Sequence, residues 1–75
     1  MDNKYAELTV FLSVVEQGSF SAAARKQELS PSAVSKLIAR LEARLHVRLF
    51  ERIGGTIRLT QEGERFRAAG EQVVQ

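Results

Sequence analysis

Residues 19–45 constrain the fold most, because their pattern indicates a short helix, a tight turn and a longer helix. Ser30 and Pro31 mark the start of the longer helix, since serine is a good N-cap and proline suits the first helical position. Apolar residues then recur at helical spacing, at Val34, Ile38, Leu41 and Leu45. The spacing predicts a helix over 31–45 and, with Ser19 capping a helix from Phe20 to about Glu28, a helix-turn-helix.

The face opposite that apolar stripe combines small, hydroxylic and cationic side chains. It carries Ser32, Ser35, Lys36, Ala39, Arg40 and Ala43, and Arg44 extends the cations into a basic ridge. Small residues allow close approach to base edges, and cations neutralise phosphates. We therefore expect this face to bind a polyanion in the manner of a major-groove helix, the alternative being a solvated face with no partner.

Net charge is only +2, but its distribution is more informative. Residues 25–58 hold eight Lys and Arg against three Glu, a local charge of +5, whereas the two flanking segments are −2 and −1. A positive centre between slightly acidic ends fits one surface that faces nucleic acid.

The remaining segments complete a small, mainly α domain. A first helix over 4–17 should bury Leu8, Phe11, Val14 and Val15, leaving Glu7, Tyr5 and Val10 off that stripe. Phe20 and Leu29 should fill the core beside Ala22–Ala24.

Two β-prone runs, 49–53 and 56–59, flank Gly54-Gly55 and predict a hairpin. It should pack on the helices through Phe50, Ile57 and Leu59 and project Arg52 and Arg58 as a wing, although a core-capping hairpin with incidental arginines explains each arginine equally well. Thr60 should cap a last helix whose inner face is Phe66, Ala69 and Val73, and which needs a partner helix.

Several function classes are disfavoured. The chain has no Cys, one His, no Gly-rich phosphate loop and no carboxylate pair suited to a cleft, so an enzyme is not expected. His46 is expected to have a structural role rather than to bind a metal, and no cofactor is expected. No apolar run approaches a membrane span and the first residues lack signal-peptide order, so we expect a cytoplasmic protein.

The order of these elements resembles the N-terminal DNA-binding domain of LysR-type transcriptional regulators of bacteria. The resemblance covers nearly the whole chain, through Phe11, Gly18-Ser19-Phe20, Ala22–Ala24, Leu29-Ser30, Ala33-Val34-Ser35, Ile38, Leu41-Glu42, Leu45, Leu49–Arg52, Leu59-Thr60 and Gly63. It implies a winged helix-turn-helix over 1–60, with a three-helix core and a two-stranded wing. Residues 61–75 would begin a linker helix that pairs with its counterpart in a homodimer. The first and last helices would supply the interface, and the operator would be dyad-symmetric. An effector domain would follow in such a regulator and is absent here, so a small-molecule effector would act only through that domain.

The resemblance also assigns contact positions. Base reading falls on Pro31, Ser32, Ser35 and Lys36, with Arg40 further along the same face; Ser19 and Ser21 match phosphate contacts, and Ser30 matches the recognition-helix cap. Three departures stand out. Pro31-Ser32 replaces a common Gln-Pro, which removes an adenine-reading amide. Gly55 stands where many members place a wing-tip arginine; Arg52 and Arg58 are nearby, and the resemblance does not decide whether either substitutes. His46 replaces a glycine.

A second hypothesis is a winged-helix module that binds protein instead of DNA. The low net charge and the apolar residues Tyr5, Val10 and Val74, expected to be exposed, motivate it. It predicts that reversing the charges of Lys36 and Arg40 leaves partner binding intact.

Overall fold

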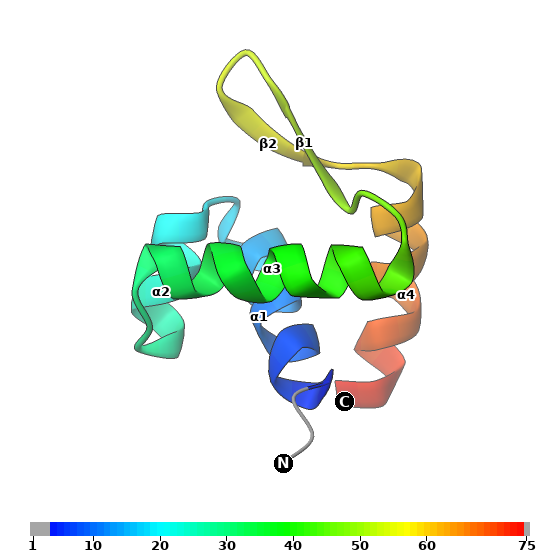
Figure 1. Ribbon diagram of the computed structural model, residues 1–75, viewed down its shortest axis with the longest axis horizontal. Coiled ribbons are helices and arrows are strands. Elements are labelled where there is room, and N and C mark those ends of the chain that lie inside the picture. The colour runs from blue at the N-terminus through cyan, green and yellow to red at the C-terminus, as the bar shows by residue number, and fades with distance from the viewer. Residues whose placement is uncertain (1–3, 75) are drawn as a thin grey trace.

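The computed structural model describes residues 4–74, and the side chains of residues 4–73. The elements are α1 (Lys4–Gln17), α2 (Phe20–Gln27), α3 (Pro31–Leu45), β1 (Phe50–Ile53), β2 (Thr56–Leu59) and α4 (Gln61–Val74). In Figure 1, α3 crosses in front of α1, the β1–β2 hairpin rises above it, and α4 stands beside its C-terminal end. The architecture is the predicted winged helix-turn-helix. No helix among residues 4–74 is long and apolar enough to cross a membrane.

The helix boundaries follow from local chemistry. Ser19, Ser30 and Thr60 each precede a helix, and their hydroxyl oxygens accept a hydrogen bond from the backbone N–H three residues later, at 2.9–3.1 Å. At the other end, α2 and α3 stop at residues in the left-handed region, Glu28 (φ 59°) and His46 (φ 60°). The backbone N–H of His46 donates to the carbonyl of Glu42, which closes α3 without the usual glycine. The predicted caps are confirmed.

The core lies where α1, α2, α3 and the base of the wing meet. Its buried apolar members are Val10, Phe11, Val14, Ala23, Ala24, Val34, Ile38, Leu41, Leu49 and Phe50. Phe11 is at its centre, with ring centroids 5.3 Å from Phe50 and 5.1 Å from Phe66. Ile57 and Leu59 pack against this core, so the hairpin is fastened as predicted.

Three expectations about α1 and the turn were wrong. Val10 is buried, as is Glu7, while Leu29 is 38% exposed. The buried arc of α1 is wider than one stripe because α2, α3 and α4 all pack against this helix. In α2 the buried residues are Ala23 and Ala24, and Phe20 packs against the core beside them, while Leu29 follows the end of this helix.

The inner face of α4 also differs from the prediction. Phe66 is partly buried as expected, but Ala69 and Val73 are exposed, and two glycines occupy the contact positions. A Cβ on Gly63 would lie 2.3 Å from the carbonyl oxygen of Leu49, and one on Gly70 would lie 2.6 Å from the side chain of Leu8. The glycines that weaken the helix therefore let its backbone approach the core.

Candidate nucleic-acid interface

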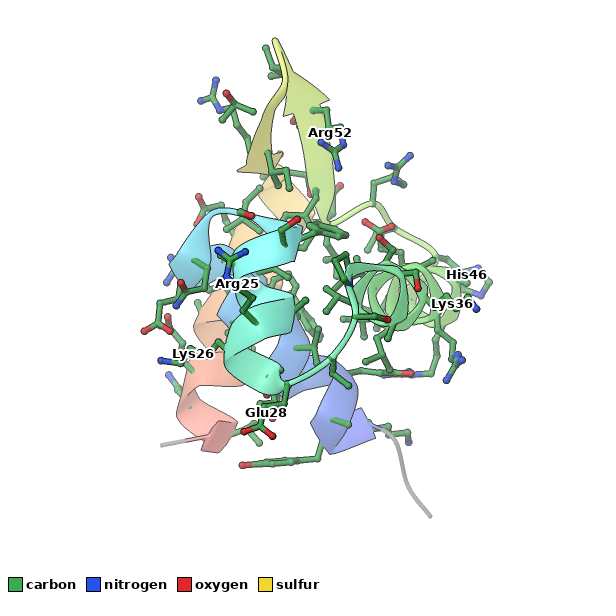
Figure 2. All side chains as sticks on the ribbon, turned by 90° about the vertical axis from the view of Figure 1, so that its left-hand side faces the viewer. Arg25, Lys26, Glu28, Lys36, His46 and Arg52 are labelled. Atoms are coloured by element: carbon green, nitrogen blue, oxygen red, sulfur yellow. The ribbon has the colours of Figure 1, made fainter. Side chains whose placement is uncertain are left out.

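The outward face of α3 is an open surface of polar and basic side chains. Ser32, Ser35, Lys36, Ala39, Arg40 and Ala43 are all exposed. Figure 2 shows Lys36 on the side of α3 that faces away from α2. The side of the helix on which base reading was predicted is therefore not packed against the body of the domain.

Ser19 and Ser30 have both a capping role and spare hydrogen-bonding capacity. Each hydroxyl oxygen accepts from a backbone N–H of its own helix at 3.1 Å. A hydroxyl also carries one donor, so Ser19 can still donate to an anionic oxygen, and one of the two paired hydroxyls of Ser30 and Ser32 can do so too. The oxygens of Ser30 and Ser32 are 3.3 Å apart, which ties the first turn of α3 into one hydroxyl cluster.

The predicted basic ridge of α3 is shorter than its sequence spacing indicates. The guanidinium of Arg44 donates to the carboxylate of Glu7, which lies buried in α1. Arg44, which would have extended the ridge beyond Lys36 and Arg40, is thus paired with Glu7. The outward basic surface is carried by the first two-thirds of the helix, and the last turn is bound to the domain.

The two wing arginines lie on opposite faces of the hairpin. In the antiparallel register Arg52 pairs with Ile57, and Arg58 pairs with Glu51. Because side chains alternate along a strand, Arg52 shares a face with Phe50 and Ile57, which pack on the core. Arg58 is on the other face, so the two arginines cannot do the same work at one surface.

The surroundings of Arg52 place it between the wing and the helix-turn-helix. Its guanidinium carbon lies 5.9 Å from the centre of the Phe20 ring, within cation–π range. It lines a hollow of about 330 Å³ with Ser35 and Ala39 of α3, and a second of about 310 Å³ with Ser19 and Ser21.

Arg58, by contrast, lines a hollow with Val14, Val15 and Gly18 at the end of α1 and with Glu64 of α4. The structure therefore gathers Arg52, but not Arg58, with the predicted contact residues of α2 and α3. The wing tip itself is Gly54-Gly55, with φ values of 58° and 80°, and presents no side chain.

Two residues that position this surface were not predicted. Glu42 accepts hydrogen bonds from the backbone N–H groups of Leu49 and Phe50, at 2.8 and 3.3 Å, and so joins α3 to the wing. Phe20 supports Arg52. Glu42 was signalled in the sequence as the single acid of a basic helix, whereas the position of Phe20 under Arg52 required the hairpin register.

Residues 5–64 match the family described as bacterial regulatory helix-turn-helix proteins, lysR family. The chain belongs to the LysR family. It is 52% identical over 58 residues to an HTH-type transcriptional regulator of Azotobacter vinelandii, covering 77% of this chain and 40% of that protein. It is 41% identical over 75 residues to the regulator CrgA of Neisseria meningitidis serogroup C, covering all of this chain and 25% of CrgA. The chain therefore spans less than half the length of these two LysR-type relatives.

Solved structures agree with the family assignment. A crystal structure of the CbnR DNA-binding domain in complex with DNA superposes with a TM-score of 0.89 at 31% identity, covering 95% of this chain and 82% of that one. This LysR chain is thus a winged helix-turn-helix DNA-binding domain, and its fold and relatives are those of transcriptional regulators, not enzymes.

Proposed function

We propose that this LysR-family domain recognises a specific duplex DNA sequence with the first turns of α3 in the major groove. The observation that carries the proposal is the outward face of α3, where Ser32, Ser35, Lys36 and Arg40 are exposed together. Serine hydroxyls can donate to or accept from base edges, and the two cations can neutralise phosphates. At the first helical position, Pro31 stands where many family members have the amide side chain of glutamine. Base reading is therefore left to the serine hydroxyls.

Phosphate contacts are assigned to the helix caps and the wing. Ser19, Ser21 and Ser30 present hydroxyls at the N-terminal ends of α2 and α3, where the helix dipole favours an anion. Arg52 is proposed as the wing residue that contacts DNA, because it lies beside these hydroxyls and beside α3. Arg58 was proposed alongside it; its place on the opposite face supports a lesser contribution.

The domain is further proposed to act as a homodimer through α1 and α4, in the bacterial cytoplasm and without a cofactor in this chain. Exposed apolar residues on these helices, Tyr5 of α1 and Val73 of α4, support a second copy as the partner. The protein-binding alternative is weakened because Val10, one of the residues that motivated it, is buried. The side chain of Val74, another of them, lies outside the described residues. Two-fold symmetry would match an operator with two half-sites, and sedimentation at micromolar concentration tests it; a strict monomer with and without DNA would contradict it.

Selection from a random duplex library, followed by titration of the selected and a scrambled duplex at two salt concentrations, tests the main proposal. We expect the selected sequence to bind at least tenfold more tightly, and both affinities to fall steeply with salt because phosphate contacts release counterions. Ser35→Ala and Pro31→Gln should each alter the selected sequence. Equal affinity for both duplexes would refute specific recognition.

A further inference from the structure

Glu42 carries the one carboxylate of α3. It lies where the end of α3 meets Leu49 and Phe50 at the start of the wing, and this contact region is called the joint. Its side chain is only 16% exposed, although the next two residues of the helix, Ala43 and Arg44, are exposed. Oε2 accepts from the backbone N–H of Leu49 at 2.8 Å and of Phe50 at 3.3 Å, and Oε1 lies 3.6 Å from Nε of Arg48. The carboxylate therefore holds the first residues of the wing to the recognition helix.

The backbone of Glu42 reinforces the same joint. Its carbonyl oxygen accepts from the N–H groups of His46 and Val47, so one residue both ends α3 and receives the start of the wing. On the other side of the joint, the N–H of Thr60 donates to the carbonyl of Leu49 at 2.9 Å. Leu49 is thus held by α3 through its N–H and by the start of α4 through its carbonyl.

This joint sets where the wing stands relative to α3. Arg52 is three residues from Leu49 along β1, and Glu42 lines the same hollow as Arg52, Ser35 and Ala39. A rigid connection keeps the arginine and the serine in one arrangement, whereas a loose one would let the hairpin swing and add an ordering cost to DNA binding.

We propose that Glu42 is a positioning residue for DNA recognition: its carboxylate fixes the wing against α3 so that Arg52 and the outward face of α3 contact the duplex together. The proposal rests on the DNA-binding function proposed above. It also explains why an acid is tolerated on a helix that faces a polyanion, since the carboxylate charge is directed to backbone N–H groups and Arg48.

The sign of one substitution separates positioning from simple charge. Removing a negative charge close to DNA should strengthen binding if charge alone matters. A positioning role predicts the opposite, namely that Glu42→Ala weakens binding to the selected duplex about fivefold, at a temperature at which circular dichroism shows the variant fully folded. Glu42→Gln keeps an oxygen acceptor and should retain most of the affinity. Glu51→Ala is the matched control, because Glu51 is an exposed acid on the wing and its loss should not weaken binding.

A double-mutant cycle identifies the coupled residue. If the joint acts through the wing, Glu42→Ala should cost little in an Arg52→Ala background but its full fivefold in a Ser35→Ala background. A general loss of folded protein would reduce affinity equally in both backgrounds. Amide hydrogen exchange of Leu49 and Phe50 should also accelerate in Glu42→Ala without DNA.

The outcomes are distinguishable from failure of the function itself. If the wild-type chain selects no duplex, both proposals fail. If the wild type is specific but Glu42→Ala binds as tightly as the wild type or more tightly, or if its loss is the same in the Arg52→Ala and Ser35→Ala backgrounds, only the positioning role is overturned.

Discussion

The two ends of α3 carry similar charged residues and use them differently. Lys36 and Arg40, towards the N-terminal end, are exposed on the outward face. Arg44, one turn further on, is bound to the buried carboxylate of Glu7, and Glu42 is bound to the wing. The first two-thirds of the helix is free for a ligand (the free part), and the last third is anchored (the anchored part). A cation every four residues is therefore not by itself a binding ridge, because burial on the partner helix decides which cation is free.

Substitution in the anchored part of α3 should lower the free energy of unfolding. Arg44→Ala would leave the Glu7 carboxylate buried without this cation, and breaking a fully buried pair costs about 3–5 kcal/mol. Because the Arg44 side chain is 38% exposed, we expect a smaller loss of about 2 kcal/mol in the free energy of unfolding, measured by urea denaturation. Arg40→Ala is the matched control and should change stability by less than about 0.5 kcal/mol. Equal effects of the two substitutions would remove the distinction between the free and the anchored part.

Substitution in the free part of α3 should lower DNA affinity instead. Lys36→Ala should lower affinity for selected and scrambled duplexes alike, by about tenfold or 1.4 kcal/mol, and reduce the salt slope by about 0.9 for one lost phosphate contact. Stability should be unchanged. Fluorescence titrations at several salt concentrations measure both quantities, and an unaltered salt slope would show that Lys36 does not contact phosphate.

The wing extends the comparison, because its two arginines also divide between an inner and an outer face. Arg52→Ala should weaken binding about fivefold, since Arg52 lies beside α3 and the cap of α2, whereas Arg58→Ala should weaken it less than twofold. The two variants remove the same charge, so a common electrostatic effect cancels in their ratio. A larger effect of Arg58→Ala would mean that the outer face of the hairpin meets the DNA.

The sequence predicted most of these elements but not their pairings. Ser19, Ser30-Pro31 and Thr60 mark helix starts through local chemistry, and Gly54-Gly55 marks the hairpin, so the element order could be read from residues close together in the chain. The partners of Arg44 and Glu42 could not be read in this way. Glu7 is 37 residues from Arg44, and the backbone N–H groups that Glu42 accepts from are placed by the path of the chain between α3 and β1. The same limit explains the errors at Val10 and Leu29, whose burial depends on which helices pack against them.

The inner face of α4 illustrates this limit in another way. Glycine weakens a helix interior, yet a Cβ on Gly63 would lie too close to the carbonyl of Leu49, and one on Gly70 would meet the side chain of Leu8. Arg67, between the two glycines, donates hydrogen bonds to Glu64 and Glu71, and these bonds raise the pKa of its guanidinium, the bond to Glu64 most. Propensity alone ranks these glycines as unfavourable, whereas the backbone contact at Gly63 leaves no room for a Cβ.

The smallest expected effect concerns the end of the anchored part of α3. His46 ends α3 in the left-handed region, where a residue with a Cβ is strained and glycine is not. His46→Gly should therefore raise the free energy of unfolding by about 0.5 kcal/mol, the relief of strain being partly offset by the greater freedom of glycine in the unfolded chain. Ala43→Gly, within the helix, should do the reverse and lower it by about 1 kcal/mol. Neither the salt slope nor the selected sequence should change for His46→Gly. A change in either would show that the C-terminal end of α3, and not only its free part, takes part in recognition.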